Sequence, residues 1–67
     1  MDIDEYRQEL LKKYALAQYY LGIKVTYHIK HQWFGNEMLM NVPIDKLESL
    51  IREFRVMYHK INKDQIK

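Results

Sequence analysis

The sequence has no cysteine, and only one proline and two glycines among 67 residues. Without cysteine the chain forms no disulfides, which is typical of a reducing, cytosolic environment. A chain this short buries only about 60% of the surface that its unfolded form exposes. Small domains therefore often depend on disulfides, a metal or oligomerisation. The length of 67 residues predicts a single domain over residues 1–67. Because disulfides are excluded, we expect self-association to stabilise this domain.

Long apolar runs are also missing, since none approaches the roughly 20 residues that a membrane span needs. The N-terminal segment MDIDEYRQELL is acidic and lacks the basic start and apolar centre of a signal peptide. We therefore expect a cytoplasmic protein with no membrane association. The net charge of +2 is too small to indicate a nucleic-acid partner by itself.

Residue types that support catalysis are equally scarce. Ser49 is the only serine and Thr26 the only threonine, and no His-Asp arrangement accompanies Ser49. A glycine-rich phosphate loop is excluded because the only glycines are Gly22 and Gly35. We expect neither enzymatic activity nor a cofactor.

The three histidines do not have the spacing of a metal site. His28 and His31 are three apart on a segment that we predict below to be a strand, so they would point to opposite faces. His59 has no His or Cys one turn away. Zinc needs three or four convergent ligands, so the sequence predicts no metal site.

Two segments have the apolar periodicity of α-helices. In the first, residues 3–21, Asp2 and Glu5 resemble a capping box. The second follows Pro43 and covers about residues 44–60, after which the polar residues 62–67 are expected to fray. Apolar residues recur at three- and four-residue steps in both: Ile3, Tyr6, Leu10, Tyr14, Ala17 and Leu21, then Leu47, Leu50, Ile51, Phe54, Met57, Tyr58 and Ile61.

Between these helices the side chains alternate as in a β-hairpin. Strands over about residues 24–34 and 37–42 would join at Gly35-Asn36, because both residues tolerate the positive φ of a two-residue turn. The predicted fold class is therefore α+β: one α-β-β-α domain whose two-stranded antiparallel hairpin is covered on one face by two helices. The core face of the hairpin would carry Val25, Tyr27, Ile29, His31, Trp33, Met38, Met40 and Val42.

The predicted hairpin is too narrow for its helices. Two paired strands span about 10 Å, whereas two packed helices cover about 20 Å. Edge-to-edge pairing of two hairpins would complete a four-stranded sheet in a homodimer. The first helix offers a second route to self-association through apolar residues beyond its main stripe: Leu11, Ala15, Tyr19 and Tyr20, with Leu16 beside them.

These observations favour a small non-catalytic protein that binds a protein partner and forms a homodimer. By association rather than by physical argument, its size and its Tyr, Ile and Lys content suit a regulator or inhibitor encoded by a phage or mobile element. The face of the hairpin opposite its core face would be free to bind a partner. The alternative is nucleic-acid binding by basic residues of that outer face and of the second helix, although only Phe34 could stack a base on the outer face. The predicted partner-binding residues are Lys24, His28, Lys30, Gln32, Phe34 and Leu39.

Overall fold

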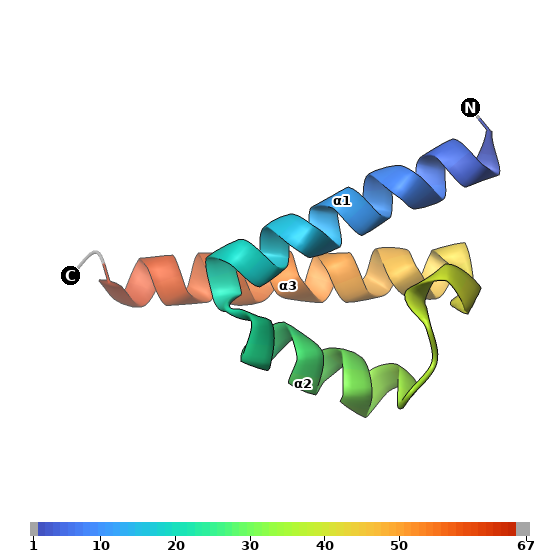
Figure 1. The fold of residues 1–67 in the computed structure, drawn as a ribbon. Helices are drawn as coiled ribbons and strands as arrows, with labels where there is room; N and C mark the ends of the chain where they lie inside the picture. Colours follow the sequence, from blue (N-terminus) through green and yellow to red (C-terminus); the bar gives the residue numbers. More distant parts are fainter. Residues whose placement is uncertain (1, 66–67) are drawn as a thin grey trace.

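The computed structural model describes residues 2–65, with side chains through Ile61, and places them in three α-helices (Figure 1). Helices α1 and α3 run in the same direction, and α2 returns antiparallel to both. A short 3-10 turn, η1, precedes α3. The bounds are Ile3–Leu21 for α1, Ile23–Phe34 for α2, Leu39–Asn41 for η1 and Ile44–Gln65 for α3.

The predicted hairpin is wrong, because residues 2–65 contain no β-strand. Residues 24–34 belong to α2, and residues 37–42 form a connection that includes η1. The fold is therefore all-helical rather than α+β. A dimer completed by a four-stranded sheet is excluded with the strands that would have formed it.

Two periodicities compete in the segment that forms α2. Val25 and Tyr27 belong to the alternation that predicted a strand, but both are exposed. Thr26 is buried, Ile29 and Phe34 pack against the core, and Lys30 between them is half-buried. These positions recur at three- and four-residue steps, as on one helix face. The hydroxyl of Thr26 donates to a carbonyl of the preceding turn at 3.0 Å, so burial leaves it satisfied. Because Thr26, the one buried residue of α2, is polar, the helical stripe is not evident from the apolar pattern of the sequence.

Both glycines have positive φ and lie at helix ends. Gly22 (φ 97°) separates α1 from α2, and its N–H donates to the carbonyl of Gln18 at 3.0 Å. Gly35 (φ 63°) ends α2, and its N–H donates to the carbonyl of His31 at 2.8 Å. Glycine adopts such φ values without the clash of a Cβ. The feature interpreted as a hairpin turn is therefore a helix C-terminus.

The start of each long helix follows its sequence signal. α1 covers the predicted range, and the Asp2 carboxylate caps it by accepting the Asp4 N–H at 3.3 Å. α3 begins immediately after Pro43, whose carbonyl accepts the Leu47 N–H at 2.9 Å. α3 continues to Gln65, beyond the end predicted near residue 60. Residues 66–67 of the predicted frayed tail lie outside the described residues.

The core lies between α1 and α3 and is closed at one end by the connection after α2. The rings of Tyr14 and Phe54 meet at its centre, with centroids 5.6 Å apart. Arg7 ties the connection to α1 by donating to the carbonyls of Leu39 and Val42. The buried hydrophobic residues are Leu10, Tyr14, Val42, Leu47, Leu50 and Phe54.

Three side-chain contacts show how α1 and α3 are aligned. Tyr6 donates from its hydroxyl to Oε2 of Glu48 at 2.7 Å. Tyr14 meets Phe54 further along, and the rings of Tyr20 and Tyr58 lie 5.2 Å apart near the end of α1. Both residue numbers increase together, as a parallel helix pair requires. Within the part of the chain described, no helix combines the length and the apolar character needed to cross a bilayer.

Candidate functional site

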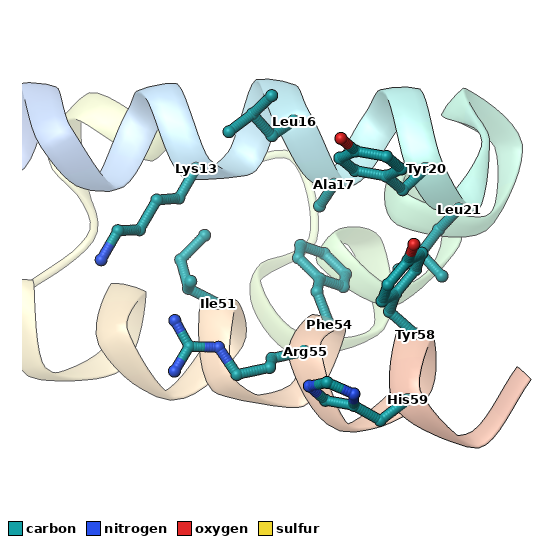
Figure 2. A pocket seen from close by; sticks show the side chains of 10 residues that line it. All are labelled: Lys13, Leu16, Ala17, Tyr20, Leu21, Ile51, Phe54, Arg55, Tyr58 and His59. Atoms are coloured by element: carbon teal, nitrogen blue, oxygen red, sulfur yellow. The ribbon is translucent and has the colours of Figure 1, made fainter. Parts of the chain in front are cut away.

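A groove of about 380 Å³ runs between α1 and α3 (Figure 2). None of its lining residues belongs to α2, whose ribbon lies behind the two helices in this view. The groove therefore occupies the side of the α1–α3 pair that the rest of the fold leaves uncovered. Its lining residues are Lys13, Leu16, Ala17, Tyr20 and Leu21 of α1 and Ile51, Phe54, Arg55, Tyr58 and His59 of α3.

The floor of the groove is apolar because the two helices meet there through core residues. The α1 side of the groove carries apolar side chains that the fold does not bury: Leu16 is 55% exposed and Tyr20 is 58% exposed. Tyr20 contacts Tyr58 across the groove and also meets Tyr19 edge to face, with centroids 5.3 Å apart. Large exposed rings beside an apolar floor are typical of a protein-binding surface.

Basic side chains also line the groove. Lys13 comes from α1, and Arg55 and His59 come from α3. An adjoining hollow of about 130 Å³ shares Lys13 and Arg55 and adds Arg52. Among residues 2–61 the only ion pair is the exposed Glu9–Lys12 contact at 3.7 Å, so the groove cations have no carboxylate at ion-pair distance. The acidic side chain that shares a hollow with Lys13 and Arg55 is Glu48. The charge of the groove cations favours an anionic ligand.

Acidic side chains lie towards the N-terminal ends of both helices. Glu48 lines the smaller hollow, and Glu5 and Glu9 line a neighbouring depression on α1. The hydrogen bond to the Glu48 carboxylate, with smaller effects of burial and of the carboxylate charge, raises the pKa of Tyr6 above its ordinary value. The side of the molecule that carries the groove is thus acidic at one end and basic at its centre.

The residues predicted to bind a partner are divided between one exposed side of α2 and the core. Lys24, His28 and Gln32 are exposed on α2, whereas Lys30 is half-buried. Phe34 and Leu39, the two apolar members of the set, pack against the core. Their grouping depended on a strand that is absent from residues 2–65.

The residues predicted for self-association are also divided. Leu11 packs against the core, and Ala15 is exposed on α1. Tyr19 is 82% exposed beside the groove, and only Tyr20 lines it.

His28 and His31 do not point to opposite faces of a strand, because both belong to α2. On α2, His28 and His31 are one turn apart and lie on the same exposed side. His31 stacks on Tyr27 with ring centroids 5.9 Å apart. Within the described residues no group of three or more His, Asp or Glu side chains is arranged to hold a metal ion.

The groove was not predicted from the sequence, although several of its residues form regular patterns there. Leu16 and Tyr20 are four apart on α1, and Arg55 and His59 are four apart on α3, so each pair marks one helix side. Those spacings indicate two exposed stripes. What they do not indicate is that α1 and α3 lie parallel and side by side, which depends on α2 being a helix.

No family model matches the chain, and no curated protein or solved structure shows significant similarity to it.

Proposed function

We propose that this chain is a non-catalytic protein-interaction module, and that the α1–α3 groove binds an amphipathic helix whose apolar face is flanked by carboxylates. The observation that supports this is the uncovered apolar groove, whose cations form no ion pair among residues 2–61. Hydrophobic grooves between helices are a common receptor for amphipathic helices. The lack of cysteine supports a cytoplasmic setting for this interaction.

The apolar contacts and the charges have different roles in this proposal. Burying one leucine-sized side chain contributes about 1.5–3 kcal/mol, whereas an exposed ion pair contributes about 0.2–1 kcal/mol. The floor around Ala17 and Phe54 therefore provides most of the affinity. Lys13 and Arg55 orient the ligand and select one with carboxylates at matching positions.

The test uses a synthetic helical peptide with leucines at positions i, i+3, i+4 and i+7 and glutamates on both flanks. Titration into the ¹⁵N-labelled chain should shift the amide signals of groove residues while those of the outer side of α2 stay in place. A matching peptide with lysines in place of the glutamates should bind at least several-fold more weakly.

Two serine substitutions provide a matched comparison. Leu16→Ser removes an apolar side chain that is 55% exposed in the groove, and Val56→Ser removes one that is 49% exposed on α3 outside it. We expect about a tenfold loss of peptide affinity for the first, equivalent to about 1.4 kcal/mol, and none for the second. Equal binding by both variants would disprove the proposal. Salt-sensitive binding of single-stranded DNA, unaffected by Leu16→Ser, would favour a nucleic-acid ligand instead.

A further inference from the structure

We propose that a second copy of this chain covers the groove, in an antiparallel two-fold dimer in which the groove of each copy lies over the acidic N-terminal half of the other copy's α1–α3 pair. This inference rests on the proposed function of the groove and names its partner. The distribution of charge along the two groove helices is the observation that selects this arrangement.

Acidic and basic residues occupy different halves of the groove side. On α1, Glu9 precedes Lys13 by one turn, and both lie beside Tyr6 on the same side of the helix. On α3, Glu48 precedes Arg55 by two turns, and both line the same hollow. An antiparallel two-fold rotation exchanges the halves, so Glu9 and Glu48 of one copy each meet a base of the other.

One two-fold axis satisfies both helices. The midpoint of Glu9 and Lys13 is residue 11, and the midpoint of Glu48 and Arg55 lies between residues 51 and 52. Contacts at residues 6 and 48 and at residues 14 and 54 set the two helices in register. Interpolation between those contacts places residue 11 of α1 level with about residue 52 of α3, at a rise of about 1.5 Å per residue. Both midpoints are therefore at the same height.

When the two-fold axis lies at this height and runs perpendicular to the helices, α1 of one copy faces α1 of the other, and α3 faces α3. Glu9 then approaches Lys13 of the second copy, and Glu48 approaches Arg55 of the second copy. The alternative two-fold, parallel to the helices, would place Lys13 of one copy over Arg52 and Arg55 of the other. Like charges in an interface are unfavourable, so the charge pattern selects the antiparallel dimer.

The same axis sets what lies opposite the exposed apolar side chains, while Ala17 of the floor becomes level with Glu5 of the second copy. Leu16 becomes level with Tyr6 of the second copy, and Tyr20 becomes level with its N-cap residue Asp2, next to the exposed Ile3. α1 has 19 residues and is about 28 Å long. A face of that length and two helices in width is comparable with a standard interface of about 800 Å² per partner.

The main test exchanges the charges. The variant Glu9→Lys/Glu48→Lys has bases at all four paired positions, and Lys13→Glu/Arg55→Glu has acids at all four. Sedimentation velocity should find the unaltered chain dimeric at tens of micromolar, each variant at least tenfold weaker in self-association, and the equimolar mixture dimeric again. The recovery in the mixture shows that the variants fold. Monomeric behaviour of the unaltered chain up to 1 mM, or variants that dimerise as well as the unaltered chain, would overturn the dimer.

A second test covers the case in which a charge variant does not fold. Because the chain has no cysteine, Glu9→Cys and Lys13→Cys each introduce a single thiol. Oxidation of their mixture should give a 9–13 crosslink in excess over the product of either variant alone. The exposed control Lys24→Cys on α2 should remain uncrosslinked. Equal crosslinking of all three thiols would overturn the arrangement.

The outcomes separate this inference from the function on which it rests. If the chain stays monomeric but binds the acidic peptide in its groove, the dimer is disproved and the peptide-binding function of the groove stands. A chain that is monomeric and does not bind the peptide loses both. A dimer that the peptide dissociates is the result expected if both are correct.

Discussion

The α1–α3 pair and α2 differ in how much of each helix the core uses. Five of the six buried hydrophobic residues belong to α1 and α3, among them Tyr14 and Phe54. The single buried residue of α2 is the polar Thr26, and α2 leaves Tyr27 and Trp33 exposed. α2 packs mainly on α1 rather than on both partners. The fold is thus a tightly packed parallel pair with a third helix attached along one side.

This difference places both the core and the candidate groove on the same two helices. The parallel pair contains the core on its inside and the groove on its uncovered side. α2 reverses the chain direction so that α3 can run alongside α1, and it covers the opposite side. Because few apolar contacts hold α2, its local opening should cost less free energy than opening of the pair.

The largest expected effect compares truncation in the pair with truncation in α2. Leu50 is fully buried, so Leu50→Ala should lower the free energy of unfolding by about 2–5 kcal/mol. Val25→Ala on the exposed side of α2 should cost less than about 1 kcal/mol. Urea unfolding followed by circular dichroism measures both. Similar losses for the two variants would show that α2 belongs to the same cooperative core.

The next comparison is between two adjacent residues at the end of α2. Gly35 has φ 63°, whereas Asn36 is not among the positive-φ residues. Gly35→Ala should therefore lower the free energy of unfolding by about 1–2 kcal/mol, while Asn36→Ala should have little effect. A type I′ hairpin turn needs positive φ at both positions. Comparable losses at both residues would indicate the hairpin rather than the helix end.

The sequence was sufficient for the two long helices because their signals agree with each other. The capping residue Asp2, the proline before α3 and the apolar stripes all indicate the same boundaries. The stripe of α3 includes Leu47, Leu50 and Phe54, which are all buried in the structure.

For α2 the local signals disagree, and the stronger local pattern is not the one that folds. Val25, Tyr27 and Ile29 have high β propensity and alternate, whereas the helical stripe contains a threonine at its buried centre. Tertiary packing against α1 decides the outcome, and one sequence does not contain that information in a local form. The groove was missed for the same reason, since it exists only if α2 reverses the chain.

A smaller effect is expected at Arg52, the base nearest to the proposed two-fold axis. The two Arg52 side chains of a dimer would approach each other without a matched acid, so Arg52→Gln should tighten self-association about two- to fivefold. The change should diminish in 1 M salt, where exposed charges are screened. Sedimentation equilibrium at both salt concentrations measures it. Weaker association of Arg52→Gln at low salt would place the axis elsewhere.

The smallest effect concerns the contact that aligns the N-terminal ends of the pair. Because the Glu48 carboxylate accepts the Tyr6 hydroxyl, the pKa of Tyr6 is raised above its ordinary 10.0 in the folded chain. The stabilisation is present below pH 10 and is lost as the pH rises through the folded-state pKa, where the unfolded chain releases the proton first. Tyr6→Phe should therefore be less stable than the unaltered chain at pH 8, and the difference should shrink above pH 10. Urea unfolding at micromolar protein concentration, where we expect the chain to be monomeric, measures this difference. Titration of the lysines and of the buried Tyr14, whose pKa is also raised, affects both proteins alike. A difference that stays constant from pH 8 to pH 11 would show that the hydroxyl of Tyr6 does not contribute to the alignment of α1 with α3.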